Sequence, residues 1–224
     1  MLDRKKLILL NGSPRKNKTS YSFARTIKNL AEDIGCVVEI FHVIDYFDGK
    51  YTLDELKASI LTSDVIGLVA PLYVDTLPYP NIWLFDKLYQ ELENEQQGKD
   101  FFMIGQCGFP DITLCQPMIE SCRYFAETVG MNWLGGLSYG GGSIIDGELL
   151  ENLGRKGKKI TSAFKLALED IFQGKKISSK PQELLTLRIP KIIYRPLAAF
   201  LNYKIKQTAR KHGVTDIFKK VYLE

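Results

Sequence analysis

A polar run near the N-terminus has the residue types and the spacing that a phosphate group needs. The segment from Asn11 to Ser20, N-G-S-P-R-K-N-K-T-S, offers the hydroxyls of Ser13, Thr19 and Ser20 together with a side-chain amide and a guanidinium. It follows a short apolar run and precedes a pattern of helical spacing. Backbone N–H groups and the positive end of a helix dipole would therefore join these donors. The run predicts a phosphate-binding loop.

Three other interpretations explain fewer residues of this polar run. A Ser, Asn or Thr ahead of a helix is often only a cap, which explains one polar residue and not ten positions. The pattern Gly12-x-x-x-x-Asn17-Lys-Thr19 resembles a nucleoside-triphosphate P-loop, but asparagine replaces the second glycine and Pro14 removes an amide donor. A strand that ends in Val69-Ala-Pro71 also lacks the magnesium-binding aspartate. No G-x-G-x-x-G follows the first apolar run, which disfavours a dinucleotide site.

Short apolar runs alternate with helical patterns along the chain. Strands are predicted at Lys6–Leu10, Val37–Val43, Val65–Ala70, Phe101–Gln106 and Asn132–Leu137. Helices are predicted at Ser20–Ile34, Leu53–Leu61, Pro80–Glu95, Gln116–Val129 and Leu149–Phe172. This alternation predicts an α/β fold, a flavodoxin-like three-layer sandwich with a five-stranded parallel sheet of order 2-1-3-4-5. Ligands then bind at the carboxyl ends of the strands, in the loops at 11–19, 71–79 and 107–115, and the glycine-rich segment 139–143 is expected near the same rim.

Composition predicts one main domain with an appendage. The chain has 224 residues, 45% of them hydrophobic and 25% charged, which is typical of a globular protein. No apolar stretch approaches the ~20 residues that span a bilayer, and no signal-peptide pattern is present, so a cytoplasmic location is expected. Residues 1–154 carry a net charge of −8 and residues 155–224 a net charge of +12. We expect the flavodoxin-like domain at 1–177 and a basic helical extension at 178–224.

Two segments resemble the family of NAD(P)H-dependent FMN reductases. The first is L-I-L-L-N-G-S-P-R-K-N-K-T-S, which ends at Ser20 and contains that family's G-S-P-R loop. The second, from Asp64 to Pro78, is similar to the family's third strand and following loop, and Gly105-Gln-Cys-Gly108 agrees with it. The resemblance covers residues 5 to about 175. It is specific for flavin binding and unspecific for substrate.

The resemblance implies an enzyme that binds FMN and takes hydride from NADPH or NADH. The cofactor-binding residues that it implies are Ser13, Pro14, Arg15, Asn17, Lys18, Thr19, Ser20, Pro71, Leu72, Tyr73, Val74, Gly108 and Phe109. The flavin carries the chemistry, so no catalytic side chain is expected, and His42 and His212 are expected to be structural.

The resemblance leaves the electron acceptor open. The acceptor is a small molecule (a quinone, nitro or azo compound, or free flavin) or a protein. A homodimer is implied, and a flavodoxin-like electron carrier reduced by a partner protein is the alternative.

The cysteines do not form a metal-binding pattern. Cys36, Cys107, Cys115 and Cys122 lack the C-x-x-C spacing of zinc and iron-sulfur sites. Iron-sulfur flavoproteins, which the family resembles, carry a compact cysteine cluster that is absent between Tyr73 and Asp100. We therefore expect no metal. Cys107 and Cys115 flank the predicted ring-binding loop, where small buried residues are the favoured interpretation and redox activity the alternative.

The extension has the pattern of a basic amphipathic helix. Apolar residues recur at helical spacing, with Lys and Arg between them, and Pro190 and Pro196 are expected to delay or kink the helix. The apolar residues are Ile189, Ile193, Leu197, Phe200, Leu201 and Ile205. Packing on its own domain or on a second subunit is the favoured interpretation, and a membrane surface or an acidic protein partner are the alternatives. Nucleic acid is not expected as a partner, because the basic residues form no recognition motif.

Overall fold

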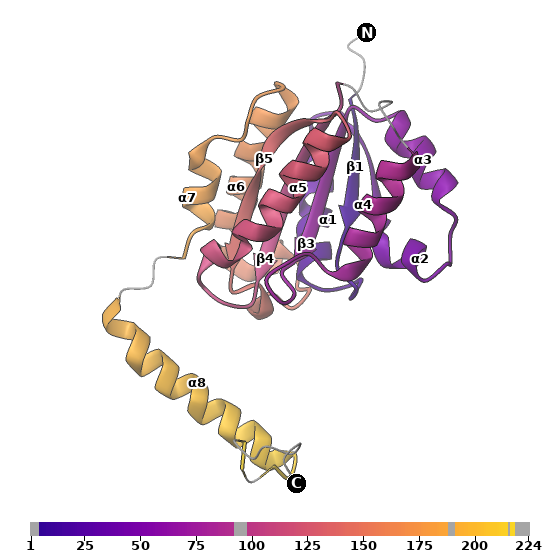
Figure 1. Ribbon diagram of the computed structural model, residues 1–224. Helices are drawn as coiled ribbons and strands as arrows, with labels where there is room; N and C mark the ends of the chain where they lie inside the picture. The colour runs from indigo at the N-terminus through magenta and orange to yellow at the C-terminus, as the bar shows by residue number, and fades with distance from the viewer. Residues whose placement is uncertain (1–4, 92–97, 188–190, 215, 218–224) are drawn as a thin grey trace. The chain divides into compact units, whose positions relative to one another are not determined.

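The computed structural model describes residues 5–91, 98–187, 191–214 and 216–217 (Figure 1). The chain divides into two compact units, Met1–Leu187 and Arg188–Glu224. The first unit contains the sheet and the helices that cover it. The second contains one long helix.

The first unit is built on a parallel sheet with the predicted strand order. The strands are β1 (Lys6–Asn11), β2 (Val37–His42), β3 (Val65–Pro71), β4 (Asp100–Cys107) and β5 (Asn132–Gly140). Their order is β2-β1-β3-β4-β5, and each neighbouring pair is parallel. The order reverses between β1 and β3, so a ligand site is expected at the carboxyl ends of these strands.

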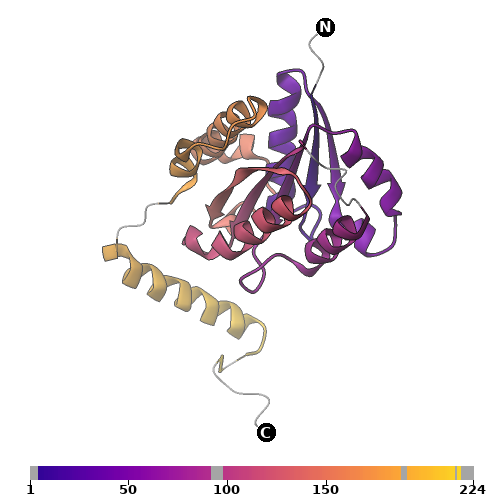
Figure 2. The ribbon, with the colours of Figure 1, turned by 45° about the horizontal axis from the view of Figure 1, so that its top comes forward.

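Helices cover both faces of the sheet (Figures 1 and 2). The helices of the first unit are α1 (Thr19–Asp33), α2 (Val43–Phe47), α3 (Leu53–Leu61), α4 (Tyr79–Glu91), α5 (Gln116–Thr128), α6 (Gly154–Phe172) and α7 (Ser179–Leu185). Short 3-10 turns lie at η1 (Ile112–Cys115), η2 (Gly142–Ile144) and η3 (Leu150–Leu153). This is the flavodoxin-like three-layer sandwich that the sequence predicts.

The alternation of side chains along each strand explains the two cores. In β1, Leu7 and Leu9 point into a core that includes Phe23 of α1 and Phe164 of α6. Ile8 and Leu10 point into the opposite core, which includes residues of α3, α4 and α5. A strand that is buried on both faces reads as a continuous apolar run, which is why the sequence shows no polar alternation there.

Some predicted boundaries differ from those of the structure. Val43 begins α2 rather than ending the second strand, and this five-residue helix was too short to leave a periodic signal. The helix predicted at Leu149–Phe172 is divided into η3 and α6, because Gly154 adopts a φ of 53° at the junction. Residues 92–95 of the helix predicted at Pro80–Glu95 lie outside the described residues.

The compact unit continues past Ser178, where the sequence predicts the domain boundary. The side chain of Gln182 in α7 accepts a hydrogen bond from the Ser138 N–H at 2.8 Å and donates one to the Ser138 carbonyl at 2.9 Å. Leu185 is buried in the core formed by α1 and α6. Helix α7 therefore completes the edge of the sheet at β5, and the unit ends at Leu187.

The second unit consists of α8 (Lys191–Lys211), a helix that continues through Pro196. It begins directly after Pro190, although Ile189 and Pro190 themselves lie outside the described residues. In the described part of the chain, no helix has the length and hydropathy needed to cross a bilayer.

Candidate functional site

A cavity of 140 Å³ lies where the carboxyl ends of β1, β3 and β4 meet. Its walls come from the loops that follow these strands and from the segment that follows β5. The lining residues are Ser13, Arg15, Lys18, Thr19, Pro71, Leu72, Tyr73, Gln106, Cys107, Gly108, Ser143 and Asp146. The cavity therefore occupies the position at which open α/β sheets bind ligands.

The loop after β1 is held by the side chain of Asn11, which is fully buried. Its amide donates a hydrogen bond to the Lys16 carbonyl at 3.2 Å, and its oxygen accepts one from the Ser13 N–H at 3.3 Å. The same amide lies 2.9 Å from Nδ1 of His42, where the neutral ring accepts the hydrogen bond. Burial, with a contribution from Lys16, lowers the pKa of His42 and favours this neutral form. His42 thus supports the loop.

An ion-pair group at the end of β2 fixes the outer side of the loop. The carboxylate of Asp45, at the start of α2, binds the ammonium of Lys16 and lies 3.1 Å from that of Lys50. Burial alone would raise the pKa of Asp45, but the hydrogen bonds from Lys16 and Lys50 outweigh it and lower the pKa. Lys16 is therefore an anchor of the loop, and its charge is neutralised by Asp45.

Helix α1 begins at the loop without a side-chain cap. Its N-cap residue is Lys18, whose side chain makes no capping hydrogen bond, and its first turn contains no acidic residue. The hydroxyl of Thr19 donates to the Gly142 carbonyl at 2.7 Å, and that of Ser20 accepts from the Gln106 amide at 3.5 Å. A helix cap therefore does not account for the polar run. The first N–H groups of a helix lack intrahelical partners, so this end of α1 favours an anion.

Cationic side chains lie at the same end of the cavity. Arg15 is exposed, and the ammonium of Lys18 forms an ion pair with Asp146 at 2.8 Å. The hydrogen bond from Lys18 lowers the pKa of Asp146, with a further contribution from Arg15. Asp146 therefore places a negative charge beside the groups that would attract an anionic ligand.

The turn after β5 closes the cavity against this loop. Gly147 has a φ of 90°, and a Cβ atom at this position would lie 2.2 Å from the carbonyl oxygen of Asn17. A larger residue there would push the two segments apart. The close approach explains how Ser143 and Asp146, which are far from the first loop in sequence, come to line its cavity.

The loop after β3 forms a tight turn on the other side of the cavity. Tyr73 and Thr76 exchange backbone hydrogen bonds of 2.9 and 3.1 Å, and the two central residues, Val74 and Asp75, have φ values of 47° and 61°. Positive φ at both positions is typical of a type I′ turn, and it is rare for a β-branched residue. Strain of this kind is most often found at functional sites. The turn leaves Val74 96% exposed.

Asn81 joins the loops that follow β1 and β3. Its side-chain amide donates to the Gly12 carbonyl at 2.8 Å and to the Pro78 carbonyl at 3.2 Å, and the residue is fully buried. A Cβ atom at Gly12 would lie 2.3 Å from the Asn81 oxygen, so glycine is required for this contact. The hydrogen bonds of Asn81 therefore fix the loop after β1 relative to the loop after β3.

The cavity lining includes Cys107, whose thiol donates a hydrogen bond to the Phe109 carbonyl at 3.2 Å. The hydrogen bond between Cys115 and Cys107 lowers the pKa of Cys107 to about 7, although burial opposes the shift. The same hydrogen bond, followed by burial, raises the pKa of Cys115. Both side chains are buried, as the sequence predicts, and Cys107 also lines the cavity.

The structure brings together most, but not all, of the predicted site residues. Those that line the cavity are Ser13, Arg15, Lys18, Thr19, Pro71, Leu72, Tyr73 and Gly108. Those that do not are Pro14, Asn17, Ser20, Val74 and Phe109. Ser20 lies behind the wall on Gln106, whereas Val74 and Phe109 are exposed. Their predicted contacts with the cofactor therefore stay a prediction.

Sequence analysis did not name Gln106, Cys107, Ser143 and Asp146 as cofactor-binding residues, although it expected the loop 107–115 and the segment 139–143 at this edge of the sheet. A signal existed for the first two, which end β4 at the expected edge of the sheet, and for Ser143, which ends the glycine-rich segment. Asp146 had no signal, because its position depends on how the turn at residues 145–148 packs against Asn17.

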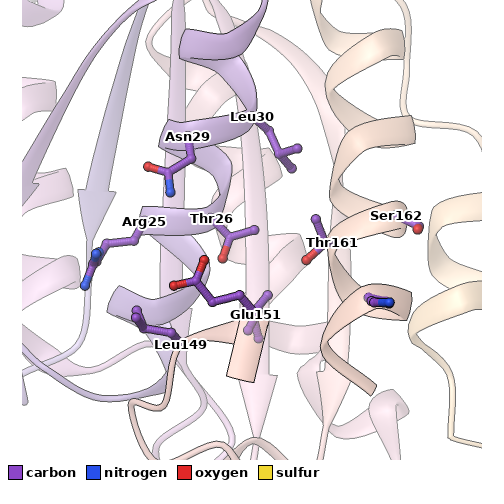
Figure 3. A pocket seen from close by; sticks show the side chains of 10 residues that line it. Arg25, Thr26, Asn29, Leu30, Leu149, Glu151, Thr161 and Ser162 are labelled. Atoms are coloured by element: carbon purple, nitrogen blue, oxygen red, sulfur yellow. The ribbon is translucent and has the colours of Figure 1, made fainter. Parts of the chain in front are cut away.

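A larger cavity of 520 Å³ lies between α1, η3 and α6 (Figure 3). Leu30 and Leu149 give it apolar walls, and Arg25, Glu151 and Lys158 add charges. It lies beside the middle of α1, whereas the smaller cavity lies at the helix N-terminus. We assign the candidate site to the smaller cavity because strand ends, an uncapped helix and cationic side chains converge there.

Residues 5–105 match the family described as NADPH-dependent FMN reductase. This match covers a little less than half of the chain. The match includes the loops after β1 and β3 and confirms the resemblance seen in the sequence. Members of the family are flavin-dependent oxidoreductases. A comparison with curated protein sequences gave no match to the chain.

Solved structures with the same fold include several flavoproteins. A putative quinone reductase from Klebsiella pneumoniae is 12% identical with a TM-score of 0.59, and the alignment covers 77% of this chain and 87% of that one. A flavone reductase is 13% identical with a TM-score of 0.56, covering 76% and 65%. RosB, with a bound 8-demethyl-8-formylriboflavin-5'-phosphate, is 12% identical with a TM-score of 0.53, covering 61% and 65%. The chain thus spans about two thirds of the last two proteins, and these likenesses show the fold.

Proposed function

We propose that the protein is an FMN-dependent oxidoreductase that receives hydride from NADPH or NADH and passes electrons to a small-molecule acceptor. The observation that carries the proposal is the uncapped N-terminus of α1, with Arg15 and Lys18 beside it, at the mouth of a cavity whose other wall is the turn after β3. The match of residues 5–105 to the FMN reductase family supports it.

The cavity fits the phosphate end of FMN. The first N–H groups of α1 and the hydroxyl of Ser13 are the hydrogen-bond donors, and Lys18 and Arg15 supply positive charge. Whole-cofactor pockets usually occupy ~300–1,000 Å³, which exceeds the 140 Å³ found here. We infer that the phosphate lies inside the cavity and that the flavin ring lies at its rim.

Residues of the turn after β3 would hold the ring. Leu72 and Tyr73 offer apolar surface next to the cavity, and the Leu72 N–H is already bonded to the Gln106 carbonyl at 2.8 Å, which fixes the position of the turn. Tyr73 is 36% exposed, so one side of this surface is open to a second molecule. Cys107 and Gly108 border the same region. When bound, FMN supplies the hydride-transfer chemistry, and the protein orients it.

The open rim suits a substrate that enters and leaves. A nicotinamide and an acceptor that bind in turn need the same exposed face. Val74 and Phe109, which follow the cavity residues Tyr73 and Gly108 in the chain, are both exposed. Structures with this fold include a putative quinone reductase and a flavone reductase, and planar acceptors suit an open face. A homodimer also stays a prediction.

Anaerobic mixing tests the proposal. Protein loaded with FMN is mixed with NADPH and, separately, with NADH, and the flavin absorbance near the visible maximum is followed in time. We expect bleaching at a catalytically useful rate with at least one of the two. Protein that takes up FMN and is not reduced by either nucleotide would instead be an electron carrier that depends on a protein partner.

A further inference from the structure

Helix α8 concentrates positive charge to an unusual degree. Between Lys191 and Lys211 it has no Asp or Glu and six Lys or Arg residues. The unit Arg188–Glu224 carries nine Lys and Arg against two Asp and Glu, a net +7, whereas residues 1–187 carry 21 against 24, a net −3. The basic character of the chain therefore belongs to this unit.

Four of the six cations of α8 and most of its large apolar side chains occupy opposite sides of the helix. At 100° per residue, the larger apolar side chains fall within about 140° of the helix circumference, and the cations outside this sector fall within about 100° on the opposite side. The apolar strip consists of Ile193, Tyr194, Phe200, Leu201 and Ile205, each about half exposed. The cations opposite it are Lys191, Arg195, Lys206 and Arg210. Ile192 and Tyr203 are the exceptions, since both fall outside the apolar sector and close to the basic side.

Lys204 and Lys211 lie within the sector of the apolar strip. The ammonium of Lys204 is 5.2 Å from the centre of the Phe200 ring, so its aliphatic stem follows the apolar surface. Long basic side chains of this kind can keep their charge in water, or at a headgroup, while their stems cover apolar surface. A helix with these features is suited to the boundary between water and hydrocarbon.

Charge favours an anionic lipid surface over a second copy of α8 as the cover of the apolar strip. A single helix cannot bury its own strip, so another surface must do so. Pairing with a second α8 would bring six positive charges against six, with no acidic residue in either helix to form salt bridges. An anionic lipid surface satisfies both sides of the helix, because acyl chains receive the strip and headgroups attract the cations.

We propose that α8 attaches the protein to the surface of a bilayer that contains anionic phospholipid. The helix lies in the plane of the surface, because it is too polar to cross the bilayer. The attachment is reversible, and it does not depend on the cofactor bound to the first unit.

Co-sedimentation with vesicles tests this proposal on the full chain. Vesicles of phosphatidylcholine alone are compared with vesicles that contain phosphatidylserine, at low and at high salt. The variant Arg195→Gln, Lys204→Gln, Arg210→Gln, Lys211→Gln removes four charges from α8. The matched control removes four exposed charges of α6 instead, by Arg155→Gln, Lys158→Gln, Lys159→Gln and Lys165→Gln.

The expected result is binding of the wild type and the α6 control to phosphatidylserine vesicles, with weakening at high salt. Each cation near an anionic surface contributes roughly five-fold to binding, so the α8 variant should bind about 100-fold or more weakly. Phe200→Ser with Leu201→Ser should also weaken binding, which pure charge attraction would not explain.

Three outcomes would overturn the proposal. The first is that the wild type does not sediment with phosphatidylserine vesicles. The second is that the α8 and α6 variants bind equally, which would place the contact elsewhere. The third is that the wild type forms a dimer in the absence of vesicles and does not bind vesicles, and that the double variant Phe200→Ser, Leu201→Ser is a monomer. An interface between copies would then cover the strip.

Discussion

One ion pair, Lys18 with Asp146, sets the charge at the mouth of the cavity. Asp146→Asn removes the negative charge next to the proposed phosphate position while keeping the shape of the side chain. The affinity for FMN should rise by roughly two- to five-fold, because the pair is exposed and partly screened by solvent. Titration of flavin-free protein by flavin fluorescence measures the change.

Asp33→Asn is the matched control for this prediction. It removes the same charge from the exposed last residue of α1, at the opposite end of the helix. The FMN affinity should stay unchanged. Equal gains in the two variants would mean that net charge, and not the position of Asp146, controls binding.

The reactivity of Cys107 should depend on pH around neutrality. The hydrogen bond from Cys115 lowers the pKa of Cys107 to about 7, so its thiolate forms as the pH rises through this value. Alkylation by iodoacetamide, followed by peptide mass spectrometry, should therefore accelerate between about pH 6 and 8. Cys122 should stay unlabelled, because burial raises its pKa.

Substitution of the donor provides the control. Cys115→Ala removes the hydrogen bond and should move the midpoint for Cys107 upward, toward an ordinary thiol. Cys115→Ser keeps a donor, so its midpoint should stay close to that of the wild type. If both variants behave alike, the hydrogen bond from Cys115 does not control the ionisation.

The sequence predicted a site residue when its position follows from the order of strands and loops along the chain. It did not predict a site residue whose position depends on tertiary packing. Ser13, Lys18 and Thr19 line the cavity because they belong to the segment that joins the end of β1 to the start of α1. Asn81 and Gln106 organise the walls through side-chain contacts between segments that are far apart in sequence, and Asp146 lies in a turn after β5. Spacing along the chain carries no information about such contacts.

The contact between the turn at residues 145–148 and the first loop should control access to the cavity. Gly147→Ala introduces a Cβ atom 2.2 Å from the Asn17 carbonyl oxygen and should lower the FMN affinity about ten-fold or more. Gly174→Ala is the control, because Gly174 also has a positive φ, of 67°, but nothing within 4 Å of the new atom. Gly174→Ala should lose about 1 kcal/mol of stability from backbone strain, and Gly147→Ala should lose more because of the added contact with Asn17. An equal loss of FMN affinity in both would contradict the role of the turn.

Elements of regular structure were predicted well because burial on both faces leaves a strong pattern. All five strands lie within a few residues of the predicted ranges, and α3 spans Leu53–Leu61 as predicted. The errors concern short elements, namely α2 and η3, which depend on local turns and glycine conformation more than on periodicity. Helix α7 belongs to the first unit for a tertiary reason, its hydrogen bonds to Ser138, that no sequence pattern reveals.

The two units predict how the whole molecule responds to truncation. A chain that ends after Leu187 keeps α7 and the buried Leu185, so its melting temperature and its FMN affinity should match those of the full chain. A chain that ends after Ile177, the boundary that the sequence predicts, loses Leu185 and the hydrogen bonds of Gln182. It should lose about 3 kcal/mol of unfolding free energy.

Thermal unfolding distinguishes the two boundaries. The shorter chain should melt roughly 6–12 °C below the chain that ends after Leu187. Equal melting temperatures would show that α7 contributes nothing to the stability of the sheet. A large loss in the chain that ends after Leu187 would show that the second unit stabilises the first.

The central claim is that the cavity at the start of α1 holds the phosphate of FMN. Titration of flavin-free protein with FMN and with riboflavin, which lacks the phosphate, tests this claim most directly. We predict that FMN binds about 100-fold or more tightly, because the charge-assisted hydrogen bonds at the helix end are absent for riboflavin. Equal affinities for the two flavins, or no uptake of either, would contradict it.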